Sequence, residues 1–167
     1  MTLCINVVHL CCSVILHKHE DIWLEENFMI GVILTGHAGF ADGMASAVNL
    51  IGGEQAKFAA VNFVEGDSGE GLAAKLQKAV EELGCEEVVF CTDLPGGTPF
   101  NQSVLLSGRL SHACRVFTGT NLPFLLTILF DREDSLAECL ARWQEAEYKV
   151  TMFAHKKKEH QAQGGGI

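Results

Sequence analysis

Strand-forming and helix-forming segments alternate along most of this chain of 167 residues, and this alternation restricts its fold more than any other feature. Short runs rich in Val, Ile and Phe are each followed by a segment in which apolar residues recur at helical spacing. Such an order predicts an open, mostly parallel, doubly wound α/β sheet with helices on both faces. The expected strands are at 30–35, 57–64, 87–92 and 114–118.

The helices between these runs are marked by apolar stripes and by residues that start or stop helices. They are expected at about 41–51, 72–83, 98–107, 123–130 and 136–143. A short polar side chain three residues before a Glu, or directly before a proline, is typical of a helix N-cap. The expected caps are Asp67 in a capping box with Glu70, Thr98 before Pro99, and Ser135 in a second box with Glu138.

One domain is expected at 29–155, including a further strand at 148–153. The stretch 1–28 does not fit the pattern, because its apolar run is shorter than a membrane span and is broken by charged residues. Met29 stands directly before the first strand, so we expect 1–28 to be a non-native or over-extended segment. Residues 156–167, which end in glycines, are expected to form a disordered tail.

The formal net charge of −9 argues against nucleic acid as a partner, because an acidic surface repels phosphate backbones. The seven cysteines include no Cys-x-x-Cys pair, which favours reduced thiols in a cytoplasmic protein over a metal site. The chain has no Walker A loop and no Gly-x-Ser-x-Gly elbow. The chain should therefore not bind ATP through a Walker A loop, and its cysteines lack the spacing of metal ligands.

Two side chains with useful chemistry follow predicted strands: His37 comes after the first and Asp93 after the third. If these strands are neighbours, both residues lie where open α/β sheets bind ligands. A carboxylate that keeps the proton on one imidazole nitrogen leaves the other free to attack phosphorus, so both are candidate catalytic residues. Each also has a structural interpretation, since a lone histidine at a strand end is more often only hydrogen-bonded and Asp93 could cap a turn.

Groups that would hold and cover a phosphate are expected near this pair. The helices expected after each residue would offer backbone N–H groups and a favourable dipole at their N-termini. The candidate phosphate-binding residues are Gly39, Gly96, Gly97 and Thr98. The candidate partner-docking residues, which would form an apolar rim, are Phe40, Leu94 and Phe100. Burial in the core is an equally good explanation for the last of these.

Three segments resemble the active-site loops of one known family: 35–43 (TGHAGFADG), 93–101 (DLPGGTPFN) and 119–122 (GTNL). That family is the enzyme IIA components of the mannose/fructose/sorbose-type phosphoenolpyruvate-dependent sugar phosphotransferase systems. The similarity extends over about residues 29–155, and it is greatest to the N-acetylgalactosamine/galactosamine branch. Ala38 departs from the family, which usually has glycine after the active histidine.

The resemblance implies that His37 accepts phosphate from the histidine-containing phosphocarrier protein and passes it to a cognate enzyme IIB during sugar uptake. It also implies a cytoplasmic homodimer that acts with the membrane enzyme IIC and IID subunits and associates peripherally with them. It implies no metal and no small-molecule cofactor. An antiparallel C-terminal strand would be exchanged between subunits, with 148–153 as the candidate. Two alternatives stay open: the phosphotransfer subunit of a phosphotransferase-dependent dihydroxyacetone kinase, and a regulatory relative that no longer transfers phosphate.

Overall fold

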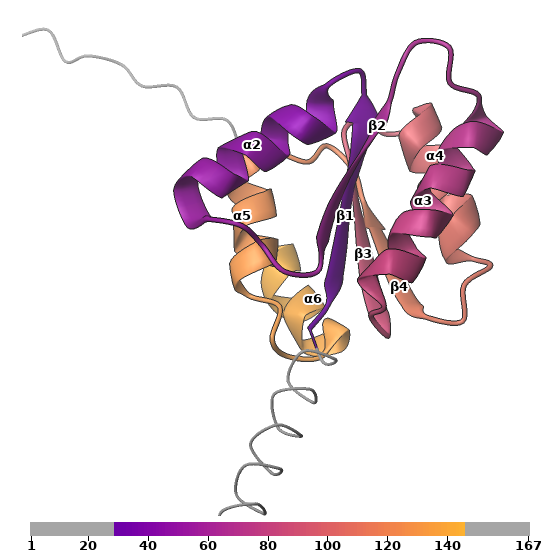
Figure 1. Ribbon diagram of the computed structural model, residues 1–167. Coiled ribbons are helices and arrows are strands. Elements are labelled where there is room, and N and C mark those ends of the chain that lie inside the picture. The colour runs from indigo at the N-terminus through magenta and orange to yellow at the C-terminus, as the bar shows by residue number, and fades with distance from the viewer. Residues whose placement is uncertain (1–28, 146–167) are drawn as a thin grey trace, which may run out of the picture.

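Four parallel strands form one sheet in the computed structural model, which describes residues 29–145 (Figure 1). Their order in the sheet is β2–β1–β3–β4. The strands are β1 (Gly31–His37), β2 (Phe58–Phe63), β3 (Glu87–Thr92) and β4 (Ala113–Phe117). The predicted parallel α/β sheet is therefore confirmed. The exchanged strand expected at 148–153 lies outside the described residues, as do the segments 1–28 and 156–167.

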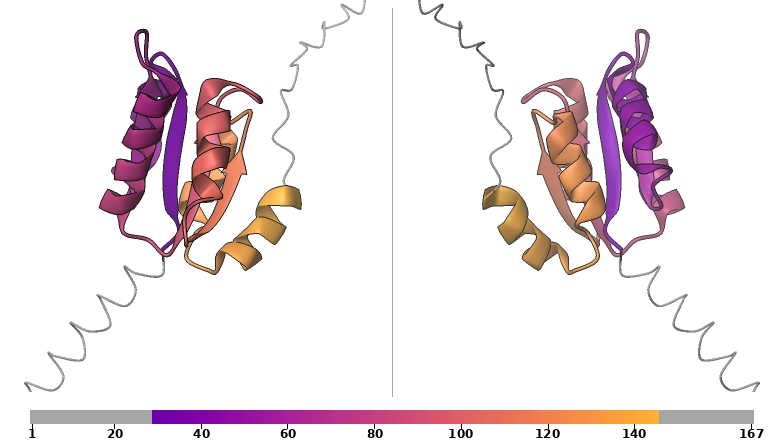
Figure 2. Two further views of the ribbon diagram at one scale, coloured as in Figure 1. Left: turned by 90° about the vertical axis from the view of Figure 1, so that its right-hand side faces the viewer. Right: turned by 90° about the vertical axis from the view of Figure 1, so that its left-hand side faces the viewer.

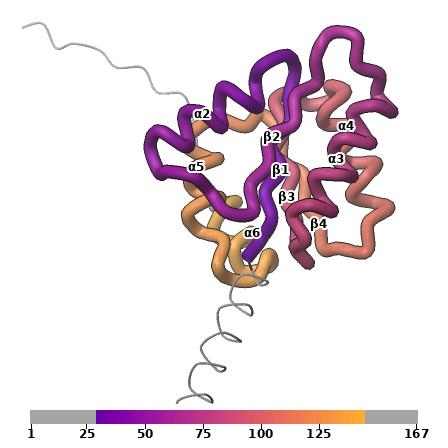
Figure 3. Tube along the Cα trace, in the orientation of Figure 1, coloured from indigo at the N-terminus to yellow at the C-terminus, as the bar shows by residue number. Residues whose placement is uncertain are grey.

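Helices cover both faces of this sheet, as the side views show (Figure 2). Helices α2 and α5 lie on one face, and α3 and α4 lie on the other (Figure 3). The helices are α2 (Phe40–Gly52), α3 (Gly69–Leu83), α4 (Thr98–Ser107), α5 (Leu122–Phe130) and α6 (Leu136–Glu145). Within residues 29–145, no helix combines the length and the apolar character that a membrane crossing requires.

The central strands divide their side chains between two cores, because successive residues of a strand point to opposite faces. Val32 and Leu34 of β1 belong to the core under α2, α5 and α6, whereas Ile33 belongs to the core under α3 and α4. Residues of β1 are therefore buried on both faces, as its continuous apolar run predicts. This burial fixes the register of β1 and with it the position of the residue at its end.

The N-terminus of α3 differs by one residue from the prediction. Its N-cap is Ser68, whose hydroxyl accepts a hydrogen bond from the backbone of the helix. The predicted cap, Asp67, instead accepts from the backbone N–H of Val64 at 3.0 Å and pairs with Lys75 at 2.7 Å. The predicted box of Asp67 and Glu70 is wrong because the Asp67 carboxylate closes the preceding turn.

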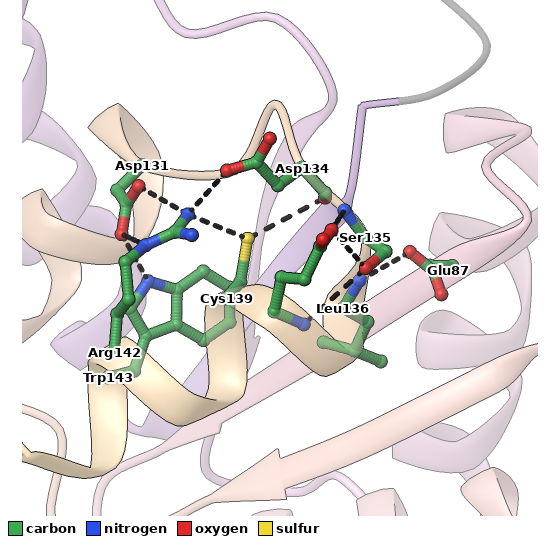
Figure 4. Close-up of polar contacts among 9 residues, drawn as sticks. Glu87, Asp131, Asp134, Ser135, Leu136, Cys139, Arg142 and Trp143 are labelled. Atoms are coloured by element: carbon green, nitrogen blue, oxygen red, sulfur yellow. Dashed lines mark hydrogen bonds and ion pairs between the residues drawn. The ribbon is translucent and has the colours of Figure 1, made fainter.

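The turn between α5 and α6 is held by a polar network (Figure 4). The predicted box of Ser135 and Glu138 is confirmed, since each side chain accepts from the backbone N–H of the other, at 3.4 Å and 3.3 Å. Arg142 donates to Asp131 at 2.6 Å and 2.9 Å, and the Trp143 indole donates to the same carboxylate at 3.2 Å. These contacts fix α6 against the core that lies behind β1 and β3.

Candidate active site

The strand order reverses between β1 and β3, and the candidate site lies at their carboxyl ends. Strands β1 and β3 pair in parallel, with Thr35 opposite Thr92. His37 is the last residue of β1, and Asp93 directly follows β3. Parallel packing therefore brings the two residues together at the point where open α/β sheets place their ligand crevice.

His37 and Asp93 form a hydrogen-bonded pair. The Asp93 Oδ2 atom lies 2.7 Å from His37 Nδ1 and also accepts from the His37 backbone N–H at 2.8 Å. An ionised carboxylate only accepts hydrogen bonds, so the proton of the neutral imidazole resides on Nδ1. The Nε2 atom keeps its lone pair. The His37 side chain is 41% exposed and that of Asp93 only 10%, so the carboxylate lies behind the ring.

The Asp93 carboxylate is kept ionised by its hydrogen bonds. Burial raises its pKa, but N–H donation from the His37 backbone, the His37 ring and the Leu94 backbone outweighs this, and the net pKa is lowered. The Leu94 bond, to Oδ1, measures 2.7 Å. The Asp93 carbonyl accepts from the backbone N–H of Gly119 at 3.0 Å, which ties the loop after β4 to the site. A fixed negative charge therefore stands behind the imidazole.

Helix α4 begins directly in front of the His37 ring. A Cβ added to Gly97 would lie 2.9 Å from His37 Cε1 and 3.7 Å from Nε2, so only glycine leaves room for the ring there. Gly97, and not the predicted Thr98, is the N-cap of α4, and no side chain caps this helix. The prediction failed because Thr98 already has helical geometry as the first residue, followed by Pro99. The uncapped N-terminus of α4 is suited to binding an anion.

A tight turn precedes α4 and presents Gly96 at the surface. Gly96 has φ of 76°, and a Cβ added there would meet nothing within 4 Å. The Gly97 N–H donates to the Leu94 carbonyl at 3.3 Å, and the Asn101 side chain donates to the Gly96 carbonyl at 2.9 Å. The sequence pattern alone does not indicate this role of Asn101, although the residue closes the segment 93–101.

The turn after His37 is strained and is held from β2. Ala38 has φ of 51°, in the left-handed region that favours glycine. Its N–H donates to the Phe63 carbonyl at 2.8 Å, and the Phe63 ring meets the His37 ring edge-on with centroids 5.7 Å apart. Gly39, the N-cap of α2, carries no side chain that could cap the helix. Asn62 of β2 takes that role, accepting from two backbone N–H groups of the first turn.

The candidate docking residues differ in how much surface they present. Leu94 is 57% exposed beside Asp93. Phe40 and Phe100 are half-buried, and Phe40 also packs against the core under α2. A Cβ added to Gly36 would clash with the Phe40 ring, so the Phe40 side chain packs over the end of β1, next to His37.

Residues 31–143 match the model of a protein family described as the PTS system fructose IIA component, where PTS denotes a phosphotransferase system. The chain belongs to this family. It is 34% identical over 106 residues to the fructose-specific EIIA component of Bacillus subtilis (strain 168), covering 63% of this chain and 72% of that protein. It is 30% identical over 132 residues to the sorbose-specific EIIA component of Klebsiella pneumoniae, covering 71% and 96%.

Solved structures of this family share the fold. The EIIA component from Streptococcus agalactiae has a TM-score of 0.65 at 32% identity, with 70% of this chain and 90% of that chain covered. The mannose/sorbose-specific IIA subunit from Enterococcus faecalis has a TM-score of 0.63 at 26% identity, covering 77% and 99%. The chain is therefore a IIA component of a sugar phosphotransferase system, and its function is phosphotransfer during sugar uptake. The galactosamine branch stays a prediction, since these relatives are named for fructose, sorbose and mannose.

Proposed function

We propose that His37 carries the phosphoryl group of this IIA component, at its Nε2 atom. The observation that supports this most directly is the bond between Asp93 and His37 Nδ1. Because this bond keeps the proton on Nδ1, the reactive lone pair is on Nε2, next to the uncapped N-terminus of α4. Acceptance of phosphate thus needs no prior proton transfer from the ring.

The transfer step exchanges one phosphorus–nitrogen bond for another. The Nε2 lone pair of His37 attacks the phosphorus of a phosphohistidine on the donor, and the donor's phosphorus–nitrogen bond breaks with its electrons returning to the donor ring. The His37 ring gains positive charge while its proton stays on Nδ1, hydrogen-bonded to Asp93, whose carboxylate stabilises that charge. The reverse set of bond changes passes the phosphoryl group to the acceptor protein.

The phosphoryl oxygens would be bound by the backbone N–H groups of Gly96 and Thr98 and by the Thr98 hydroxyl. Gly97, whose own N–H donates to the Leu94 carbonyl, would leave room for them beside the His37 ring. The first turn of α4 contributes its dipole, which favours negative charge. Gly39 is proposed to give the phosphate access on the other side, since a Cβ there would meet nothing within 4 Å. Asn62 already binds two N–H groups of α2, so α4 is the main donor.

Water must be kept from the reacting phosphorus while two proteins exchange it. We assign this to an apolar rim formed by Phe40, Leu94 and Phe100, whose side chains are exposed or half-buried. The donor would be the histidine-containing phosphocarrier protein and the acceptor a cognate enzyme IIB. The protein would act in the cytoplasm as a homodimer, next to the membrane enzyme IIC and IID subunits.

A labelling experiment tests the role of His37. The full chain is mixed with enzyme I, the histidine-containing phosphocarrier protein and labelled phosphoenolpyruvate. We expect acid-labile label on the wild type and on His112→Ala, a matched control in the loop before β4, and none on His37→Ala. Label on His37→Ala would overturn the assignment. Absence of label from every variant would indicate a regulatory relative.

The acceptor distinguishes the sugar system from a dihydroxyacetone kinase subunit. The family match and the named relatives favour a sugar system. Labelled protein should therefore lose its phosphate to an enzyme IIB of the mannose type. Transfer only to a dihydroxyacetone kinase would contradict this.

A further inference from the structure

Asn62 lies near the end of β2, and its side chain caps the N-terminus of the neighbouring helix α2. Its Oδ1 atom accepts from the backbone N–H of Ala41 at 3.1 Å and of Asp42 at 3.3 Å. Its Nδ2 atom donates to the Asp42 carboxylate at 2.5 Å. An N-cap side chain normally makes the first kind of bond from the residue next to the helix. Here the residue at that position is Gly39, so the cap comes from a neighbouring strand.

The helix that Asn62 caps follows the strained turn at Ala38. In the sheet Asn62 is opposite Gly36, and the next residue, Phe63, is opposite His37. Ala38 has φ of 51°, a conformation that an L-residue with a side chain leaves readily when nothing holds it. The turn is anchored on its near side by the Phe63 carbonyl and on its far side by Asn62.

We infer that Asn62 is a positioning residue for His37: by capping α2 from β2, it holds the strained Ala38 turn in the conformation that presents the imidazole to Asp93 and α4. The inference rests on the proposed role of His37 as phosphate carrier. The side-chain hydrogen bonds of Asn62 go to Ala41 and Asp42 of α2 and not to the His37 ring. Its effect passes through the α2 backbone, and it is needed because position 38 is alanine.

The first test is a comparison of Asn62→Ala with wild type in amide hydrogen exchange and in 15N NMR of the His37 ring, both without phosphate. We expect exchange at Ala41 and Asp42 to become about fivefold faster, as for a lost cap. The His37 ring signals should move from a fixed Nδ1–H tautomer toward an average of both. Asn49→Ala, which removes an exposed amide further along α2, should change neither.

The second test is a double-mutant cycle with Ala38→Gly, measured as the single-turnover rate of phosphate uptake. Asn62→Ala alone should slow uptake about fivefold. In the Ala38→Gly background the loss should be below about twofold, because glycine adopts positive φ without the cap. An equal loss in both backgrounds would mean that Asn62 acts independently of the turn, and would overturn the inference.

A swapped pair separates positioning from general damage to β2. In Asn62→Asp combined with Asp42→Asn, the carboxylate at position 62 accepts the same backbone N–H groups and the amide at position 42 donates back. Uptake and exchange should return to within about twofold of wild type, and failure of this rescue would count against the inference. If wild type takes up no phosphate on His37, the proposed function fails, whereas the exchange and ring signals still decide the role of Asn62.

Discussion

Replacement of Ala38 by glycine should stabilise the protein, although an alanine-to-glycine change at most other positions of a protein lowers its stability. Ala38 has φ of 51°, and its side chain is exposed, so the methyl group contributes no buried contact. The left-handed conformation costs an L-residue about 1–2 kcal/mol. Glycine adds about 0.4–1 kcal/mol of chain entropy to the unfolded state. The difference predicts that Ala38→Gly raises the free energy of unfolding by about 0.5–1 kcal/mol.

The matched control is Ala74→Gly, an exposed alanine inside α3. It makes the identical chemical change with ordinary helical geometry, and should lower the free energy of unfolding by about 1 kcal/mol. Both variants and the wild type would be unfolded in urea at one protein concentration, since any dimer links stability to concentration. The unfolded-state term is common to both variants, so the gap between them, about 1.5–2 kcal/mol, isolates the backbone strain. Equal destabilisation by the two changes would refute the strain at Ala38.

Three further predictions concern the surroundings of His37. Gly97→Ala would place a Cβ 2.9 Å from the ring at an ordinary φ of −68°, so phosphate uptake should fall roughly a hundredfold while urea unfolding changes little. Gly36→Ala would press on the Phe40 ring and lie 3.0 Å from Asp93 Cγ, so urea unfolding should show a loss of about 2 kcal/mol. Asp93→Asn should remove the pH-dependent contribution that the Asp93 carboxylate makes to the free energy of unfolding. The folded-state pKa of Asp93 is lowered, so its contribution is complete above the ordinary value of 3.8 and is lost as the pH falls through the folded value.

Each of these results has a clear contrary outcome. Gly108→Ala, at the far end of α4 with φ of −75°, is the control for Gly97→Ala and should take up phosphate normally. Normal uptake by Gly97→Ala would mean that α4 does not face the ring in solution. An unchanged stability of Gly36→Ala would show that the Phe40 ring is free to move. For Asp93→Asn, the stability gap to wild type should narrow as the pH falls below the ordinary carboxyl pKa of 3.8, and a gap that stays constant there would contradict an ionised, hydrogen-bonded carboxylate.

The sheet and its helices could be predicted from sequence because burial on both faces leaves a continuous apolar run, as in β1. Cap positions were less certain where good capping residues are adjacent. Asp67 and Ser68 both suit an N-cap, but the Asp67 carboxylate accepts from the Val64 N–H of the preceding turn and pairs with Lys75, two turns into α3. Local preference alone does not contain that tertiary contact.

The site was predictable in part. The rule for parallel sheets places His37 and Asp93 at the same edge, but their contact depends on β1 and β3 being neighbours, which the sequence leaves open. Polar side chains that form hydrogen bonds to backbone groups far away in the sequence could not be predicted from the sequence at all. Asn62 accepts from a residue 21 positions away, and buried Arg132 donates to the carbonyls of Lys57 and Ile30, which lie 75 and 102 positions away. A backbone carbonyl or N–H group is present at every position, so no residue type marks such a partner in advance.

The energies around the turn explain how alanine is accommodated beside the reactive histidine. The positive φ of Ala38 costs about 1–2 kcal/mol, and a capping side chain contributes about 0.5–2 kcal/mol to the helix that follows. Asn62 therefore offsets most of the strain that Ala38 introduces, with bonds that end three and four residues beyond it. A chain with glycine at position 38 would need no such bond. The two positions should thus be energetically coupled, and substitution at either one should alter the effect of substitution at the other.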